Sequence, residues 1–386
     1  MNKIPQSPTV SMADRVNFLK SQGKQIIGLQ TGDPDFATHS SVIEIASDYF
    51  KKGLTHYGPS QGFLDFRQAA SQKLARDNSV EYDPATEIMA THGGIHAFYT
   101  AVQAILNPGD EVLVPDPTWA THANMVTLLR GKAVRVPAYP ENNFLPLYND
   151  WEKCLTGKTR AIIINYPSNP TGVYPTLEYM EFLQDFAKTN NLWIISDEVY
   201  ENLYFEEHPV CASSVKGARE RTIIINSLSK TYAMTGWRVG FISGPNQVIE
   251  NALKASQISI TCVAPFIQKA AAFALTDLNV QAYASEMRNS YNKRRNNVMN
   301  ISADLGSKKV RAQMPMGAFY YFLDMRKLNM DSSTIANRIL EEVGVGLVSG
   351  SAFGTNGEGF VRMTIAASDQ DVAEGYRKII NWAENN

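Results

Sequence analysis

The sequence predicts an α/β protein with a large domain, in which a mostly parallel sheet is flanked by helices, and a smaller α+β domain. Three observations support this prediction. Between about residues 88 and 243, short apolar runs alternate with longer helical patterns. Beyond residue 279, a long polar helical pattern precedes a mixture of strands and helices. The chain of 386 residues is also too long for one ordinary core, so two packed lobes are expected.

The strands of the large domain are expected where the chain is almost continuously apolar, as buried parallel strands are. Between these runs, helical patterns show one apolar face, because apolar residues recur every three or four positions. This domain is predicted to span residues 40–280. Its expected strands are EVLVP from Glu111, RAIII from Arg160, LWIIS from Leu192, TIII from Thr222 and RVGFIS from Arg238. One of its apolar helix faces comprises Ile95, Phe98, Val102 and Ile105.

The smaller domain is predicted to combine residues 1–39 with residues 281–386. Its first element is a polar helix over residues 285–305, which contains no Gly or Pro and connects the two lobes. The cluster Arg294 to Asn296 is interpreted as a solvated face of that helix. A closing helix starts at Asp369, with Ser368 or Asp369 as its N-cap. Strands are predicted over residues 317–324, 345–349 and 360–366, and a helix over residues 332–342.

Composition narrows the possible functions. Hydrophobic residues make up 44% and the formal net charge is −2 without a basic stripe, so we expect neither nucleic-acid nor membrane binding. Cys154, Cys211 and Cys262 form no CxxC pair, which disfavours a disulfide framework and a zinc site, and no metal site is predicted. The first 22 residues lack the apolar core of a signal peptide, and no segment is apolar enough to span a bilayer. A cytoplasmic protein is expected.

Polar residues follow the ends of three predicted strands. In open α/β sheets, ligand-binding groups gather just beyond the carboxyl ends of the strands. The sequence therefore predicts that a lysine, an acid, amides and hydroxyls converge on one edge of the sheet. In chain order these residues are Asn165 and Asn169, then Asp197, Glu198 and Tyr200, then Ser227, Ser229 and Lys230.

An anion site is predicted at the start of the helix that follows THGG. Gly93 and Gly94 precede a helix whose free N–H groups and positive dipole end favour an anion. Arg238, together with Ser227 and Ser229, adds donors that suit phosphate oxygens. The chain has neither a GxGxxG nor a GxxxxGK[ST] motif, so nucleotide cofactors are disfavoured.

Several motifs, in order and almost from end to end, resemble those of the class I and II aminotransferases. These are the aspartate-aminotransferase-like pyridoxal-phosphate enzymes of fold type I. No single motif is specific, but the ordered set is. The motifs are TGDPDF, HYGPSQG, PDPTW, NYPSNPTG, SDEVY, SLSKTYAMTGWRVG, PMGAFY and FVRMTIA.

The resemblance implies roles around pyridoxal 5'-phosphate. Lys230 would bind the cofactor covalently and move a proton at the substrate α-carbon, and it is the implied catalytic residue together with Asp197. Asp197 would pair with the pyridinium nitrogen and keep it protonated. Asn169 and Tyr200 would hydrogen-bond the phenolic oxygen, and Trp119 would lie against the ring.

The resemblance also implies two anion sites and a homodimer. Arg362 would bind the substrate α-carboxylate, with Gly32, Asn169 and Trp119 beside it. Tyr57 would reach the phosphate from a second subunit, so that the active sites lie at the dimer interface. The remaining phosphate contacts would come from Gly94, Ile95, Ser227, Ser229 and Arg238.

Three of these residues also have a purely structural interpretation. Asp197 can cap a following helix. Trp119 can pack in the core. Arg362 can point to solvent from an edge strand or join an internal ion pair. His92 and His96 flank the glycine pair, and neither is assigned a catalytic role because Lys230 already supplies proton transfer.

The implied activity is ping-pong transamination between an amino acid and a 2-oxo acid. Ile95 stands where one branch of the family has a lysine for a second substrate carboxylate, and SQISITCVAPF contains no basic residue. We therefore expect weak activity on aspartate and a neutral, aromatic or otherwise specialised donor. A lyase, a cyclase or an oxidative deaminase on the same scaffold is the alternative. A regulator with a DNA-binding head is not expected, since only about 30 residues precede TGDPDF.

Overall fold

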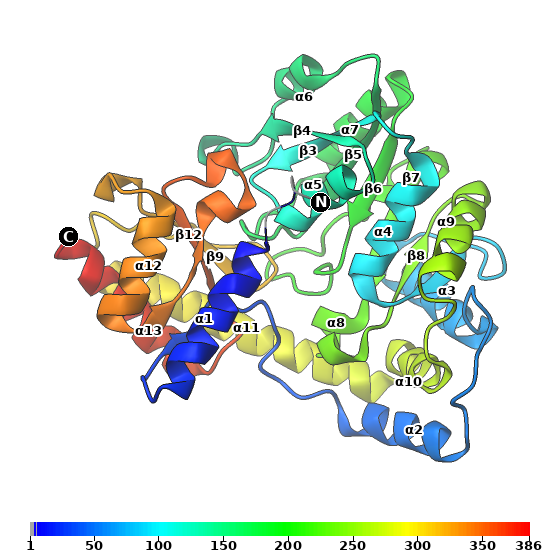
Figure 1. The fold of residues 1–386 in the computed structure, drawn as a ribbon, viewed down its shortest axis with the longest axis horizontal. Helices are drawn as coiled ribbons and strands as arrows, with labels where there is room; N and C mark the ends of the chain where they lie inside the picture. The colour runs from blue at the N-terminus through cyan, green and yellow to red at the C-terminus, as the bar shows by residue number, and fades with distance from the viewer. Residues whose placement is uncertain (1–3, 5) are drawn as a thin grey trace.

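The computed structural model describes residue 4 and residues 6–386. Residues 1–3 and 5, which belong to the stretch inspected for a signal peptide and to the predicted small domain, lie outside the described residues. Figure 1 shows two lobes, a larger one around a central sheet and a smaller one that contains the C-terminus. No helix in the described part of the chain combines the length and apolarity needed to cross a bilayer.

The large lobe is built on a seven-stranded sheet with the order β2-β8-β7-β6-β5-β3-β4. All of its neighbouring strands are parallel except β8, which runs antiparallel to both β2 and β7. The mostly parallel sheet was predicted correctly, although β2 and β4 were not among the expected runs. The strands are β2 Ile88–Thr91, β3 Glu111–Asp116, β4 Lys132–Pro137, β5 Thr159–Asn165, β6 Trp193–Asp197, β7 Thr222–Ser227 and β8 Gly240–Ser243.

Helices cover both faces of this sheet. Ile163 and Ile195 pack on the face that α4 and α9 cover, whereas Ile162 and Ile194 pack on the opposite face against α7. Because both faces are buried, these strands have no polar alternation. The helices are α2 Ser40–Lys51, α3 Leu64–Asn78, α4 Gly93–Ile105, α5 Ala120–Leu128, α6 Tyr148–Cys154, α7 Leu177–Thr189, α8 Leu228–Thr231, α9 Asn246–Ser259 and α10 Pro265–Thr276.

The reversed strand β8 brings two further segments to the edge where the parallel strands end. Gly240 at the start of β8 pairs with Ser227 at the end of β7 and with Thr91 at the end of β2. The glycine pair after β2 and Arg238 before β8 therefore lie at the carboxyl edge of the sheet. The predicted strand from Arg238 begins two residues late, because Arg238 has a left-handed φ of 54° at the end of a helical turn.

The smaller lobe contains an antiparallel sheet with the order β11-β12-β9. The short strands β1 and β10 pair in parallel and join the N-terminal and C-terminal segments of the chain. Ser368 is the N-cap of α13, since its side chain accepts from the Asp371 N–H. The division into residues 40–280 and residues 1–39 with 281–386 stays a prediction. The elements are α1 Pro8–Ser21, β1 Ile27–Gly28, β9 Tyr320–Asp324, α12 Ser332–Val343, β10 Val345–Gly346, β11 Val348–Ser349, β12 Phe360–Thr364 and α13 Asp369–Glu384.

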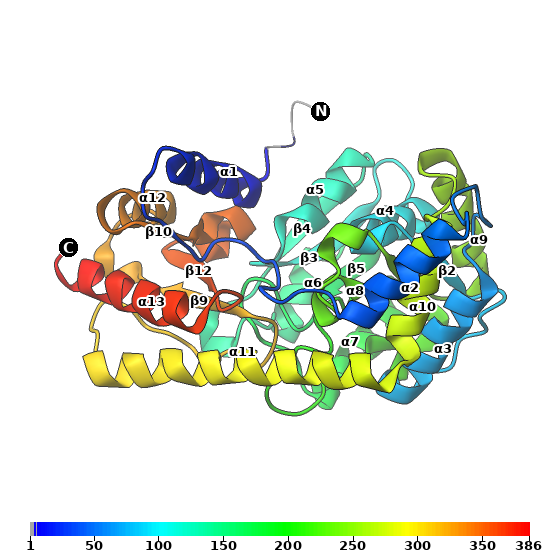
Figure 2. The same ribbon diagram turned by 90° about the horizontal axis from the view of Figure 1, so that it is seen from below.

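The long helix α11 (Leu278–Leu305) lies against both lobes, as Figure 2 shows along the lower edge of the molecule. The prediction that Arg294 and Arg295 form a solvated face is wrong, because both side chains are buried. Arg294 Nη1 lies 2.8 Å from Asp35 Oδ1, and Arg295 pairs with Glu206. Carboxylates from distant segments cover this side of the helix, and no local pattern predicts such partners. Only Asn296 of the cluster is exposed.

Candidate active site

A cavity of about 430 Å³ lies at the carboxyl edge of the large sheet, where the smaller lobe meets it. It is lined by every residue with a predicted cofactor-binding or substrate-binding role except Tyr57, which is 87% exposed. Glu198, which was also expected at this edge of the sheet, is buried and does not line the cavity. The predicted residues in the cavity wall are Gly32, Gly94, Ile95, Trp119, Asn169, Asp197, Tyr200, Ser227, Ser229, Lys230, Arg238 and Arg362. Asn165, which was expected at this edge of the sheet, also lines the cavity. The unpredicted residues in the wall are Ser7, Thr9, Val10, Thr121, Val199, Thr235 and Tyr320.

Lys230 projects into this cavity from the one-turn helix α8, which follows directly on β7. Its ammonium Nζ donates to the carbonyl oxygen of Gly32 at 2.5 Å. Burial lowers the pKa of Lys230 to about 8, although the nearby Asp33 carboxylate opposes this shift. A larger share of the amine is therefore neutral and nucleophilic near neutral pH than in a solvated lysine.

The start of α4 forms one wall of a cradle for an anion. Gly93 has a left-handed φ of 76°, and a Cβ at this position would stand 2.7 Å from Nη2 of Arg238. A glycine is therefore needed for the guanidinium to reach the helix terminus, whose first N–H groups have no intrahelical partners. Ser227 and Ser229 add hydroxyls, with their Oγ atoms 2.8 Å apart.

The donor set of this cradle suits a phosphate group. Arg238 donates from Nη1 to the Thr235 carbonyl at 2.6 Å, and it forms no ion pair with a carboxylate of the described residues. Free helix N–H groups, two hydroxyls and a guanidinium without a counter-charge all favour an oxyanion. The predicted phosphate contacts in this chain thus meet in one place.

On the other side of the cavity, a buried histidine holds Asp197. The Oδ2 atom of Asp197 is hydrogen-bonded to Nε2 of His122 at 2.9 Å, and His122 on α5 is completely buried. No helix follows Asp197 directly, so the interpretation of this residue as a helix cap is wrong. His122 was missed from the sequence, because nothing in its local pattern relates it to a carboxylate 75 positions away.

Arg362 on β12 is 1% exposed, so it does not point to solvent. Its Nη1 donates to Asn169 Oδ1 at 2.9 Å and its Nη2 to the Gln30 carbonyl at 2.7 Å. Its Nε has no hydrogen-bond partner, and no carboxylate of the described residues pairs with it. Burial lowers the pKa of Arg362, yet a guanidinium stays charged at neutral pH. A buried cation without a counter-ion is costly, which favours binding of an anion here.

Two tyrosines complete this end of the cavity. The hydroxyl oxygens of Tyr200 and Tyr320 are 2.9 Å apart, and the guanidinium of Arg362 lies 4.3 Å from the centre of the Tyr320 ring. A Cβ at Gly32 would stand only 2.0 Å from the Tyr320 hydroxyl, so this contact requires glycine. Tyr320 belongs to the PMGAFY motif, and its place in the cavity was not predicted. Trp119 is half-buried and lines the cavity, so it is not simply a core residue.

The mouth of the cavity carries an apolar surface. Ile95 is 45% exposed and Val10 of α1 is 57% exposed, and both line the cavity. The N-terminal residues on this wall were missed, because their sequence has no motif. His92 and His96 do not line the cavity. His96 Nε2 lies 2.9 Å from Ser259 Oγ, and burial lowers the pKa of His96 to about 4, so this imidazole is neutral at pH 7.

Comparison with known proteins agrees with this geometry. Residues 24–379 match the model of the family described as aminotransferase class I and II. The chain is 40% identical to an aspartate aminotransferase of Pyrococcus abyssi, over 91% of this chain and 90% of that protein. It is also 40% identical to aromatic-amino-acid aminotransferase 2 of Thermococcus litoralis, over 90% of this chain and 89% of that protein.

The fold has a solved counterpart as well. The crystal structure of an aromatic aminotransferase from Pyrococcus horikoshii superposes with a TM-score of 0.90 at 39% identity, and the match covers 97% of this chain and 99% of that one. A family model that spans most of the chain, relatives of this identity and the same fold lead to one conclusion. The chain belongs to the class I and II aminotransferases, and it is an enzyme that transfers amino groups.

Proposed function

We propose that this enzyme uses pyridoxal 5'-phosphate and exchanges an amino group between an amino acid and a 2-oxo acid by a ping-pong mechanism. One observation carries the proposal: the cavity that holds Lys230 also holds two arginines without carboxylate partners and one carboxylate bound by a buried histidine. When bound, the cofactor supplies a ring that accepts electrons from the substrate α-carbon.

Different residues around the cavity bind different parts of the cofactor. Ser227, Ser229, Arg238 and the first N–H groups of α4 bind the phosphate, because all of them are donors. Asp197 binds the pyridine nitrogen and favours its protonated form. The hydrogen bond from His122 orients that carboxylate, as partners of charged groups commonly do.

The substrate is held at the opposite end. Arg362 binds the α-carboxylate through a planar pair of donors, and Asn169 lies beside it at 2.9 Å. Lys230 binds the cofactor covalently and later moves a proton at the substrate α-carbon. Separate arginines for the phosphate and for the carboxylate keep the two anions from competing for one site.

We further propose a neutral or aromatic amino donor. Asp197, Lys230, Arg238 and Arg362 are the only charged side chains among the described residues that line the cavity, and each already has a role. A second carboxylate on the substrate would face Ile95 and other apolar groups, which would be unfavourable. The names of the relatives include both aspartate and aromatic amino acids, so they do not decide the donor.

Two further proposals concern the assembly and the location of the enzyme. Tyr57 is 87% exposed and does not line the cavity of its own chain, which fits a residue that completes the site of a second subunit in a homodimer. Lone cysteines without paired spacing fit a reducing compartment, and we propose the cytoplasm.

Single-turnover reactions test the activity. Purified enzyme with bound cofactor is mixed with each amino acid in turn, without an acceptor, and the keto acid, the ammonia and the absorbance of the cofactor are measured. A transaminase yields one equivalent of keto acid and stops in the amine form of the cofactor. Continuous release of ammonia would instead support a lyase or an oxidative deaminase.

Substitution of the lysine tests the site. Lys230→Ala should abolish the absorbance of lysine-bound cofactor and lower turnover by more than about 10⁴-fold, because covalent binding and proton transfer are lost together. The matched control is Lys254→Ala on α9, an exposed lysine outside the cavity, which should behave as wild type. Full activity in Lys230→Ala would refute the proposed mechanism.

A further inference from the structure

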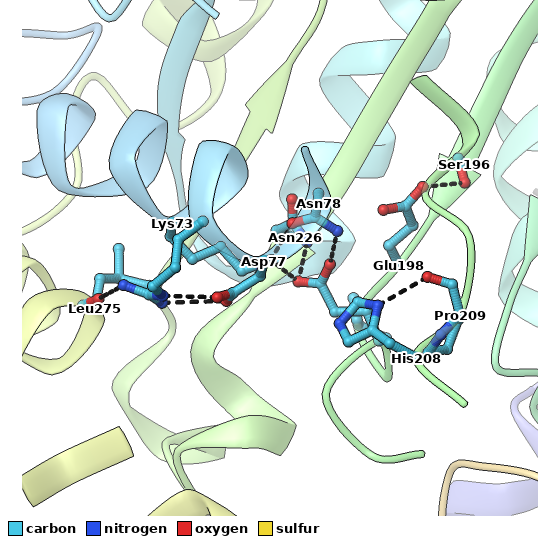
Figure 3. A network of polar contacts seen from close by, with 12 residues as sticks. Lys73, Asp77, Asn78, Ser196, Glu198, His208, Pro209, Asn226 and Leu275 are labelled. Atoms are coloured by element: carbon cyan, nitrogen blue, oxygen red, sulfur yellow. Dashed lines mark hydrogen bonds and ion pairs between the residues drawn. The ribbon is translucent and has the colours of Figure 1, made fainter. Parts of the chain in front are cut away.

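A buried polar cluster surrounds Glu201, which belongs to the turn that follows β6. Figure 3 shows this network of polar contacts from close by, with Lys73, Asn78 and Asn226 labelled. Their common partner is the carboxylate of Glu201. Glu201 Oε1 accepts from Asn226 Nδ2 at 2.7 Å and from Lys73 Nζ, and Oε2 accepts from Asn78 Nδ2 at 2.5 Å. All four residues are at most 5% exposed.

The turn presents its side chains in two directions. Asp197 and Tyr200 line the cavity, whereas Glu198 and Glu201 are buried and do not line it. The backbone of the turn is closed by the Glu201 N–H, which donates to the Glu198 carbonyl at 3.1 Å. Glu201 and the two proposed cofactor contacts therefore belong to one short stretch of hydrogen-bonded backbone.

The contacts of the cluster identify Glu201 as the acid that pairs with Lys73. Lys73 forms its shortest contact with Glu201, and the Asp77 carboxylate lies farther away at 3.9 Å and pairs with Arg76. Glu198 has no cationic partner, and its Oε2 has no hydrogen-bond partner in the described structure. Burial, reinforced by the neighbouring Glu201, raises the pKa of Glu198 to about 7.

Stability alone does not account for this arrangement. Buried ion pairs contribute little net stability, because the loss of hydration offsets their attraction. Here three donors from α3 and β7 converge on one side chain of a turn, and Asn226 directly precedes Ser227 of the anion cradle. The cluster therefore connects both ends of the proposed cofactor site.

We propose that Glu201 is a positioning residue, which Lys73, Asn78 and Asn226 clamp so that the turn holds Asp197 and Tyr200 in place toward the cofactor. The proposal rests on the proposed function. Residues that orient a ligand-binding group typically change affinity or activity about 10- to 100-fold when they are replaced. Glu201 reaches the cofactor only through the backbone of its turn.

The test is Glu201→Gln, which keeps the shape of the side chain but removes its charge and replaces one acceptor with a donor. Three quantities are measured: the affinity of the apoenzyme for pyridoxal phosphate, the pH midpoint of the bound-cofactor absorbance, and amide hydrogen exchange of residues 197–203 in the apoenzyme. We expect about tenfold weaker binding. We also expect a shift of the midpoint by at least about half a pH unit and faster exchange in this segment.

Glu206→Gln is the matched control. Glu206 pairs with the buried Arg295 on α11, and neither residue lines the cavity. Both substitutions remove one ion pair to a buried cation, so both lower the melting temperature. Only Glu201→Gln should change the affinity and the midpoint. Equal shifts in the two variants would show a general loss of stability and overturn the proposal.

A milder variant covers the case in which Glu201→Gln does not fold. Asn78→Ala removes one neutral donor from the clamp, and it should change affinity and midpoint in the same direction by a smaller amount. Wild-type values in every folded clamp variant would overturn the proposal while leaving the proposed function intact. Wild-type enzyme that binds no pyridoxal phosphate would overturn both.

Discussion

At the scale of single residues, the amine of Lys230 is tuned by opposing effects. Burial disfavours its charged form, whereas the Asp33 carboxylate and the Gly32 carbonyl favour that form. Burial prevails, so the pKa is lowered from its ordinary value to about 8. Because this pKa lies below that of a solvated lysine, the amine becomes neutral at lower pH, and its nucleophilic form prevails above pH 8.

The first prediction concerns the rate at which apoenzyme captures pyridoxal phosphate. Only the neutral amine attacks the aldehyde, so the rate should rise about tenfold per pH unit below the pKa of Lys230 and level off above about pH 8. Stopped-flow absorbance between pH 6 and 10 measures it. Free N-acetyl-lysine amide, which has a solvated amine, serves as the reference. An inflection in the protein at the same pH as in this reference would contradict the prediction.

The second prediction concerns Ile95, which is 45% exposed at the cavity mouth. Ile95→Lys places a cation on the wall that lacks one, and it should raise kcat/KM for aspartate relative to a neutral donor by about 10- to 100-fold, the value of a charge-assisted hydrogen bond. Ile95→Met is the control, since it keeps the wall apolar and should leave the ratio near wild type. An unchanged ratio in the lysine variant would place the second carboxylate elsewhere.

The sequence predicted most of the residues that line the cavity. Their motifs follow strands whose carboxyl ends lie at the same edge of an open sheet. It did not predict His122, whose role depends on a contact with Asp197 across the fold. Nor did it predict Val10, which reaches the cavity from a helix with no distinctive pattern. Residues that act through tertiary contacts have no local signal, and this limits what a single sequence reveals.

At the scale of elements, burial explains which strands were recognised. The predicted strands β3, β5, β6 and β7 are covered on both faces, so their apolar runs are nearly continuous. Strand β4 lies at the edge of the sheet and is mostly half-buried, and its mixed sequence KAVRVP was not recognised. The reversal of β8 was not predicted, since strand direction depends on chain connections rather than on composition.

The third prediction concerns α11, whose Arg294 links two distant acids. Arg294 is buried, and its Nε lies 2.6 Å from Oδ1 of Asp369 at the start of α13. Arg294→Met leaves the Asp35 carboxylate without its partner, and it should lower the free energy of unfolding by about 3 kcal/mol. Asp369→Asn, at a side chain that is 79% exposed, should cost less than about 1 kcal/mol. Urea titration of both variants measures these changes.

Comparing the stability losses of these two variants shows whether Arg294 acts as a buried ion-pair partner or as a surface one. If both variants lose the same small amount of stability, then Arg294 behaves as the solvated residue that its sequence context suggested. A large loss of unfolding free energy in Arg294→Met alone would show that the buried contacts of Arg294 stabilise the packing of α11.

At the scale of the whole molecule, the cavity depends on both lobes. Lys230, Asp197 and the anion cradle come from the large sheet, whereas Arg362 comes from β12 of the smaller lobe. The contact between Lys230 and Gly32 joins segments 198 positions apart. Substrate and cofactor would thus be held by different lobes, and the relative placement of the lobes sets the geometry of the reaction.

The fourth prediction concerns assembly. Tyr57 is 87% exposed and does not line the cavity of its own chain, so the dimer proposal gives this aromatic side chain a role. We expect sedimentation equilibrium to give twice the mass of one chain. Tyr57→Phe should weaken pyridoxal phosphate binding about tenfold, as expected for loss of one hydrogen bond to a charged group. Tyr148→Phe, at another exposed tyrosine, should leave binding unchanged. A monomer that binds the cofactor fully, or equal affinities in the two variants, would remove Tyr57 from the site.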